Sequence, residues 1–318
     1  MSYDPIEIAI SKIEDICSRD LGARGIGPLA AFAKSNLYRA AQSIATHRAP
    51  HVAIMTGFWI LHGKPPSPEN DGPPGAAHIA AALHAANIPT RIVTDTLSAY
   101  AVRATVKGAG LPEDFPVDVV SLSGRGGEHG RSIDDVRADW IAALPPVSHV
   151  IAIERCGPRA DGRTYNARGF DISAVNAPLH ELFSGGSWTK IGIGDGGNEL
   201  GMGSLPRSLV EANILNGERV ACAVPCDHLL VCGVSNWGGY AVPAALALLR
   251  PDLKSALTAH LNREADLAIL KAAVFDGHAV QGATGTEVLS VDKLPWEIHA
   301  NLLDEVVNVI EEVCGNGN

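Results

Sequence analysis

The chain has 318 residues, of which 46% are hydrophobic and 19% are charged, and its formal net charge is −10. This length and apolar content predict a globular protein with a large buried core. The negative charge argues against a nucleic-acid partner, which would need a basic face. Six cysteines are scattered without Cys-x-x-Cys spacing, so neither a disulfide scaffold nor a zinc ribbon is indicated. A basic leader segment and a membrane-length apolar run are both missing, so we expect a cytoplasmic protein without a membrane partner.

Two amphipathic helices are predicted near the N-terminus, over residues 5–20 and 28–47, with several glycines between them. Short apolar segments then alternate with helical patterns. The predicted strands cover residues 51–55, 91–94, 117–120, 149–153, 189–193 and 229–232. The predicted helices begin near Gly75 and lie around residues 97–109, 132–143, 177–184 and 237–249.

The predicted strands are continuously apolar instead of alternating, which indicates burial on both faces. Strands that alternate with helices are typical of parallel β-α-β units. We therefore predict an α/β fold, a mostly parallel sheet with helices on both faces. Residues 1–48 are expected to form an N-terminal helical extension, and residues 49–318 a single α/β catalytic domain.

Acidic residues recur where the predicted strands end, and this edge of a parallel sheet is where ligands bind. Asp71 follows the strand at 51–55 after a loop, where it could also form a simple turn. Asp95 precedes a helix, and a capping role is the better interpretation there. Glu154 is a poor cap, and the apolar strand before it would carry it into the interior. Asn236, after the last predicted strand, offers an amide to a ligand.

The segment from Gly194 to Gly203 contains five glycines in ten residues, so a ligand could approach its backbone closely. The polar side chains at its start, Asp195, Asn198 and Glu199, all carry oxygen. A hard metal ion or a polar small molecule suits that combination. The twelve histidines show no pair at metal-binding spacing, so a zinc site held by histidines has little support.

Residues 192–197 also match Gly-x-Gly-x-x-Gly after a strand, the pattern of dinucleotide-binding loops. Asp195 would repel a pyrophosphate at that position, and the pattern normally opens the first β-α unit instead of a late one. A dehydrogenase is therefore not predicted.

Four ordered segments together resemble the D-glutamate cyclase family: residues 70–76, 153–168, 194–203 and 233–240. One departure is Cys156, which follows Glu154-Arg155 where the family pattern has alanine. The resemblance covers the chain from about residue 50 to its end and implies a hydro-lyase of D-amino acid metabolism. The implied reaction is the cyclodehydration of D-glutamate to 5-oxo-D-proline and water.

The resemblance also implies roles for particular residues. A divalent cation, Mg²⁺ or Mn²⁺, would polarise the γ-carboxylate. Its expected ligands are Asp71, Glu154, Asp195 and Glu199, with Asn198 as a neutral catalytic neighbour. A carboxylate that is not fully committed to the metal, Glu199 or Asp161, would act as acid and base.

The expected substrate is a small acidic amino acid, which a negatively charged protein must attract by local cations. Arg155 or Arg168 would pair with its α-carboxylate, although arginines in such a loop are most often simply solvated. Arg155 could instead point to the side opposite Glu154 or form an ion pair elsewhere. Asn166, Asn236 and the backbone at Gly196 and Gly197 are further expected substrate contacts. A homo-oligomer is possible.

Two other functions remain open at this stage. Acidic residues on several strand ends also hold paired metals in phosphohydrolases, so a metal-dependent phosphohydrolase is one alternative. The second is a domain that binds a small anion without turnover.

Overall fold

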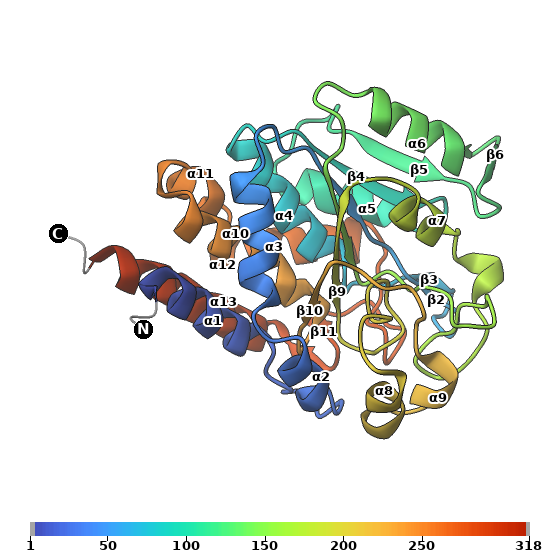
Figure 1. Ribbon diagram of the computed structural model, residues 1–318. Coiled ribbons are helices and arrows are strands. Elements are labelled where there is room, and N and C mark those ends of the chain that lie inside the picture. The colour runs from blue at the N-terminus through green and yellow to red at the C-terminus, as the bar shows by residue number, and fades with distance from the viewer. Residues whose placement is uncertain (1–3, 316–318) are drawn as a thin grey trace.

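An eight-stranded sheet runs through the centre of the computed structural model, which describes residues 4–315 (Figure 1). All neighbouring strands are parallel except the last two, which form an antiparallel ribbon at one edge. In spatial order the strands are β10 (His228–Val231), β9 (Thr189–Gly194), β8 (His149–Ile153), β1 (Val52–Met55), β4 (Thr90–Asp95), β5 (Val117–Val120), β7 (Gly130–Ser132) and β6 (Arg125–Gly127).

The six predicted strands are confirmed to within one residue at each end, and so is the α/β class with its mostly parallel sheet. The ribbon of β6 and β7 was not predicted, because its glycine-rich polar residues lack an apolar pattern. Successive side chains along each strand lie on opposite faces of the sheet, so the strands contribute to two separate hydrophobic cores. On β1, Val52 and Ile54 belong to one hydrophobic cluster, whereas Ala53 and Met55 belong to another. This two-sided burial explains the continuous apolar strands.

The larger core lies between one face of the sheet and most of the helices. Its central helix is the alanine-rich α4 (Pro73–Ala85), which packs so closely on α10 (Gly238–Leu249) that a Cβ at Gly239 would lie 2.5 Å from Gly75 Cα. The helices of this layer are α1 (Pro5–Cys17), α3 (Asn36–Thr46), α4 (Pro73–Ala85), α5 (Ala99–Gly108), α10 (Gly238–Leu249), α11 (Lys254–Thr258), α12 (Arg263–Lys271) and α13 (Trp296–Gly315).

The opposite face carries two smaller layers. Helices α6 (Ile133–Ala142) and α7 (Leu179–Ser184) cover its middle. Helices α2 (Gly27–Phe32), α8 (Arg207–Asn213) and α9 (Gly217–Val220) gather near β10, whose Leu229 and Val231 join their cluster. Helices therefore cover both faces, as predicted.

The N-terminal helical extension is present, but its second predicted helix is interrupted. Residues 28–47 form α2 and α3, which are separated by Ser35 in the left-handed region at a φ of 72°. Helix α1 packs along α13, so the first and last helices of the described chain lie side by side (Figure 1). Residues of α1 and α3 share the larger core with the sheet. The domain boundary near residue 48 stays a prediction, and residues 1–3 and 316–318 lie outside the described residues.

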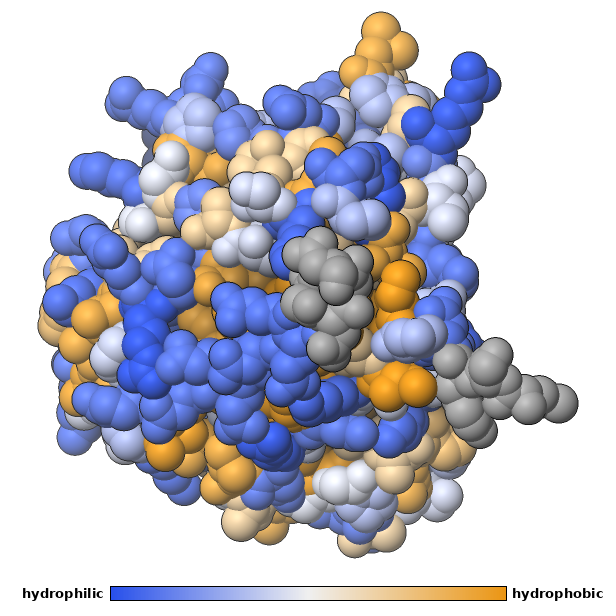
Figure 2. Space-filling model, turned by 90° about the vertical axis from the view of Figure 1, so that its left-hand side faces the viewer, coloured by the Kyte–Doolittle hydropathy of each residue, from blue (hydrophilic) through white to orange (hydrophobic). Residues whose placement is uncertain are grey.

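The outer face near α1 and α13 is mainly hydrophilic, with apolar residues in smaller groups among the polar ones (Figure 2). Within residues 4–315, none of the helices is both long and apolar enough to cross a membrane.

The order of the six main parallel strands sets the position of the site. Strands β1, β4 and β5 extend the sheet in one direction, and β8, β9 and β10 extend it in the other. This is the doubly wound order, and a crevice opens where it reverses, beyond the carboxyl ends of β1 and β8.

Candidate active site

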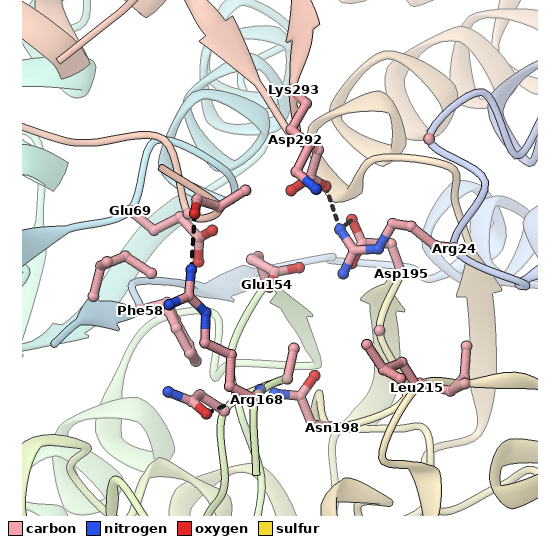
Figure 3. Close-up of a pocket in the computed structure, with 18 of the residues that line it drawn as sticks. Arg24, Phe58, Glu69, Glu154, Arg168, Asp195, Asn198, Leu215, Asp292 and Lys293 are labelled. Atoms are coloured by element: carbon pink, nitrogen blue, oxygen red, sulfur yellow. Dashed lines mark hydrogen bonds and ion pairs between the residues drawn. The ribbon is translucent and has the colours of Figure 1, made fainter. Parts of the chain in front are cut away.

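A cavity of about 410 Å³ opens beyond the carboxyl ends of β1, β8 and β9. Figure 3 shows the carboxylates of Glu69, Glu154 and Asp195 around one opening, with Arg24 and Arg168 on opposite sides of it. Segments far apart in the sequence therefore converge at the switch point of the sheet. The polar and charged lining residues are Arg24, His62, Glu69, Glu154, Asn166, Arg168, Asp195, Asn198, Asp292 and Lys293.

Glu154 is the first residue after β8, and its backbone adopts a φ of 44°. A side chain in this left-handed region is strained, and such strain persists at functional sites that the surrounding structure holds in place. Gly72 makes room for it, because a Cβ there would lie 2.7 Å from Glu154 Cβ. The Glu154 carboxylate accepts a hydrogen bond of 2.5 Å from Ser235 Oγ, at the end of β10. The local backbone thus aims a carboxylate into the cavity.

The loop after β9 shapes a second acidic wall. The Oε1 atom of Glu199 accepts hydrogen bonds from the backbone N–H groups of Asp195 and Gly196, at 3.0 and 2.7 Å. Its Oε2 atom is buried and has no hydrogen-bond partner among residues 4–315. A buried, unpartnered carboxylate oxygen is costly unless a ligand satisfies it. Gly197 adopts a φ of 86°, which closes this loop tightly.

Two groups of three carboxylates meet at Asp195. In one group, oxygens of Glu154, Asp195 and Glu199 lie within 4.8 Å of one another. In the other, Asp71 and Asp292 stand with Asp195 at the same spacing. An all-oxygen donor set suits Mg²⁺ or Mn²⁺, and the unpartnered Glu199 oxygen shows that the first group fits such a cation.

Burial and like charge act together on these acids. Burial raises the pKa of Glu154 well above its ordinary value, and Glu199 and Asp71 add to the shift. Burial likewise raises the pKa of Glu69, with Asp292 as the next cause. Such clusters of perturbed carboxylates in a cavity are typical of functional sites.

Arg24 supplies a positive charge to this acidic wall. Its Nη2 atom lies 2.9 Å from Asp195 Oδ1, and its Nη1 atom pairs with Asp292. Burial by itself would lower the pKa of Arg24, but Asp195 and Asp292 outweigh it and raise the pKa well above its ordinary value.

Asp71 and Asn236 lie behind the cavity wall. The Asp71 carboxylate accepts three hydrogen bonds, from the backbone N–H groups of Gly72, Ser235 and Asn236. The Asn236 amide accepts from the N–H groups of Gly72 and Gly75 and donates to the Asn70 carbonyl. Its oxygen and its amide nitrogen thus join two loops, and the prediction that Asn236 contacts substrate has no cavity contact to support it. Asp71 remains within reach of Asp195 and Asp292.

Arg155 also departs from its predicted role. Its fully buried guanidinium donates to the carbonyls of Gly57 and Ala177 and to Asp95 Oδ2, all within 2.7 Å. Neither Arg155 nor any of these three partners is among the residues that line the cavity. These contacts give Arg155 a structural role, and its binding to a substrate carboxylate stays a prediction that no cavity contact supports. The Oδ1 atom of Asp95 accepts from the N–H groups of Leu97 and Ser98 in the turn before α5, whose N-cap residue is Ser98, so Asp95 stabilises this turn and does not cap the helix directly.

Asp161 lies in an exposed loop outside the cavity, where it binds Arg159 and the Tyr165 hydroxyl. The Arg163 backbone N–H and the Tyr165 and Arg159 side chains lower the pKa of this carboxyl. An exposed acid held in its ionised form is a poor general acid, so the predicted catalytic role of Asp161 is not supported.

Four other predicted residues do line the cavity: Asn166, Arg168, Gly196 and Asn198. The Asn198 amide donates to Cys156 Sγ and to the Tyr165 carbonyl, at 2.9 and 3.0 Å. The Arg168 guanidinium donates to the Ala283 carbonyl and contacts His62 Nε2. Their roles toward a substrate stay predictions.

Sequence reasoning missed four charged lining residues. Glu69 stands two residues before the Asp71 that the pattern identified, and this proximity was an available signal. Arg24 comes from the N-terminal extension. Asp292 and Lys293 form the turn of the hairpin between β11 (Ser290–Val291) and β12 (Leu294–Pro295), at φ values of 50° and 66°. No motif marks these last three.

The glycine pattern at residues 192–197 does not form a dinucleotide loop. No helix begins directly after it, because the next helix of the described chain, α8, starts at Arg207. Its N–H group at Gly196 is already used by Glu199. The structure agrees with the rejection of a dehydrogenase.

The fold and the cavity define a doubly wound α/β protein with a carboxylate-rich site for a small molecule at its switch point. A family model described as "D-glutamate cyclase-like, C-terminal" matches residues 13–307, and the chain belongs to this family. The human mitochondrial D-glutamate cyclase is 32% identical over 349 aligned positions, which cover 97% of this chain and 54% of the human protein. The chain thus spans about half the length of this relative.

Proposed function

We propose that the protein is a lyase that cyclises D-glutamate to 5-oxo-D-proline and water. Membership of the family and the name of the human relative support this substrate. One structural observation carries the proposal: oxygens of Glu154, Asp195 and Glu199 lie within 4.8 Å of one another where Glu154 and Asp195 line the cavity, and the buried Oε2 atom of Glu199 has no hydrogen-bond partner in the described part of the chain. A binding domain for an anion alone would not need this concentration of negative charge.

Glu154, Asp195 and Glu199 would hold Mg²⁺ or Mn²⁺ when such an ion is present. The bound cation would supply Lewis acidity at the γ-carboxylate, which is otherwise a poor electrophile. The Glu199 carboxylate is already oriented by two backbone N–H groups, so one oxygen is fixed and the other is presented. A carboxylate with one oxygen held by the backbone and the other unpartnered suits the role of a metal ligand better than that of an acid or base.

The remaining cations of the lining would hold the substrate. Arg168 and Lys293 stand at the cavity, where either can pair with a carboxylate of D-glutamate. Asn166 and Asn198 supply neutral polar groups beside them. Amine and γ-carboxyl belong to one molecule, so holding the substrate folded gives the advantage of proximity. The glycine-rich loop at Gly196 lets the substrate approach the backbone.

The reaction forms one C–N bond and releases one oxygen as water. Both protons that the substrate ammonium loses finish on that oxygen. Glu69 is the side chain we assign to this transfer, because it lines the cavity and belongs to neither group of clustered carboxylates. Burial raises the pKa of Glu69 well above its ordinary value, which favours the protonated form that a proton donor needs.

The test is incubation of the protein with Mn²⁺ and either D- or L-glutamate, with 5-oxoproline read by chiral mass spectrometry. We expect metal-dependent conversion of D-glutamate and much slower conversion of the L form. Asp195→Asn should abolish the conversion while the circular dichroism spectrum stays unchanged. Release of phosphate from a chromogenic ester, with no 5-oxoproline, would instead support the phosphohydrolase alternative.

Location and assembly are separate matters. A cytoplasmic location, a small acidic substrate as the main partner, and a possible homo-oligomer remain predictions from the sequence.

A further inference from the structure

The guanidinium of Arg24 lies inside the acidic wall of the cavity. Its Nη2 atom is 2.9 Å from Asp195 Oδ1, its Nη1 atom is 3.2 Å from Asp195 Oδ2, and Nη1 also binds Asp292. Figure 3 shows this side chain reaching across from the N-terminal segment to the hairpin that carries Asp292. A planar guanidinium that bridges two carboxylates holds a fixed positive charge at that point, since arginine is not deprotonated in proteins.

The loop that carries Arg24 is built to place it there. The Asp20 carboxylate accepts hydrogen bonds from the backbone N–H groups of Arg24, Gly25 and Ile26. Gly25 is required, because it adopts a φ of 86° and a Cβ at this position would collide with the Asn213 carbonyl. The arginine is therefore anchored at its backbone as well as at its side chain.

The two groups of carboxylates differ in the hydrogen bonds and ion pairs that their oxygens already form. In the group of Asp71, Asp195 and Asp292, the Asp71 oxygens accept three backbone hydrogen bonds, and Arg24 spans the other two acids. In the group of Glu154, Asp195 and Glu199, the Glu199 Oε2 atom is buried without any partner in the described part of the chain. Arg24 thus pairs with two of the three acids in the group of Asp71, Asp195 and Asp292. In the group of Glu154, Asp195 and Glu199 it pairs with Asp195 alone, and Glu154 and Glu199 form no ion pair within residues 4–315.

We infer that the cavity binds a single divalent cation, at Glu154, Asp195 and Glu199, and that Arg24 occupies the place of a second one. This inference rests on the metal dependence of the proposed function. It assigns a one-cation site to the protein, and it separates that site from those of phosphoryl-transfer enzymes, where two metal ions about 3.5–4 Å apart act on one phosphate.

The experiment counts Mn²⁺ ions bound by the full chain, by isothermal titration calorimetry and by electron paramagnetic resonance. The wild type should bind one ion per chain with the signal of an isolated Mn²⁺. Arg24→Met keeps the apolar stem and removes the charge, so it should bind two ions with a spin-coupled signal. Arg24→Gln is the second variant, in case the methionine disturbs the fold. The double variant Arg24→Met, Asp292→Asn should return to one ion.

Arg163→Met is the matched control, because its exposed guanidinium pairs with Asp171 outside the cavity, and it should still bind one ion. A wild-type count of two, or a count of one in both Arg24 variants, overturns the inference. Measuring the turnover of D-glutamate in the same samples distinguishes a failure of this inference from a failure of the proposed function. A wild type with two ions and full turnover overturns the inference alone, whereas one ion without turnover refutes the function alone. A wild type that binds no ion refutes both.

Discussion

Replacing Arg155 by methionine tests whether this arginine is part of the scaffold or contacts the substrate. The structure buries the guanidinium completely and gives it three acceptors: Asp95 and the carbonyls of Gly57 and Ala177. Methionine would fill much of the same space without the charge. The Asp95 carboxylate, itself only 1% exposed, would then lack its cation.

The expected loss of stability follows from these contacts. Removing one partner of a buried ion pair costs about 3–5 kcal/mol, because the other charge remains buried. Each carbonyl left without its donor adds roughly 1–3 kcal/mol, although such losses are not additive. We expect the free energy of unfolding to fall by at least about 3 kcal/mol. Domains are typically stable by only about 5–15 kcal/mol, so the variant would be markedly weakened.

The assay is urea unfolding followed by circular dichroism, with Arg163→Met as the exposed control, for which the change should stay below about 1 kcal/mol. Asp95→Asn in the Arg155→Met background should restore part of the loss, because it removes the unpaired charge. The reasoning would be refuted by a variant of unchanged stability. An unchanged unfolding curve together with a raised KM for D-glutamate would return Arg155 to the substrate site.

Three further outcomes are expected. Burial lowers the pKa of His149 to about 4, whereas the unfolded chain binds a proton at this residue below about pH 6.5. The free energy of unfolding should therefore fall from pH 7 to pH 4. His149→Asn should remove up to roughly 3 kcal/mol of this pH dependence, whereas His129→Asn, at an exposed position, should leave it unchanged. Glu69→Gln should lower kcat at least about 100-fold in the D-glutamate assay without changing the number of Mn²⁺ ions bound, and a retained kcat would exclude Glu69 as the proton carrier. Gly72→Ala should lower the melting temperature more than Gly110→Ala does. Both glycines have a positive φ, but only Gly72 lacks space for a Cβ. Equal decreases in the melting temperature would contradict the packing argument.

The sheet could be predicted because its signal is local. Each central strand is a short apolar segment that is buried on both faces, and each helix between strands has its own periodic pattern. The break between α2 and α3 could not be seen, because Ser35 is not a residue that usually marks a left-handed position. The β6–β7 ribbon was missed because edge strands of glycine and arginine carry no apolar pattern.

The site was predictable only where it follows the strand ends. Glu154, Asp195 and Glu199 come from β8 and β9, and parallel topology brings those ends together. Side-chain direction was not predictable in the same way. Arg155 follows Glu154 directly, yet the left-handed backbone at Glu154 turns the two side chains to different surroundings. The closeness of a residue to a motif in the sequence therefore does not predict on which side of a strand terminus its side chain lies.

Arg24 and Asp292 could not be predicted from the sequence, because their meeting depends on the packing of the two ends of the chain. Neither lies in a motif or after a central strand of the sheet. Helix α1 packs along α13, and this contact brings the loop after α1 to the hairpin before α13. Only the assembled fold shows that a remote arginine pairs with Asp195 and Asp292.

The separation of 268 residues between Arg24 and Asp292 also bears on how the protein is made. During synthesis the central strands leave the ribosome well before the hairpin at residues 290–295. Until that hairpin arrives, Asp195 can already meet Arg24, but the outer wall of the cavity is missing. A truncated or stalled chain would contain most of its hydrophobic core without a closed site. Catalytic competence would therefore require the hairpin at residues 290–295, which supplies the last cavity-lining residues to be synthesised.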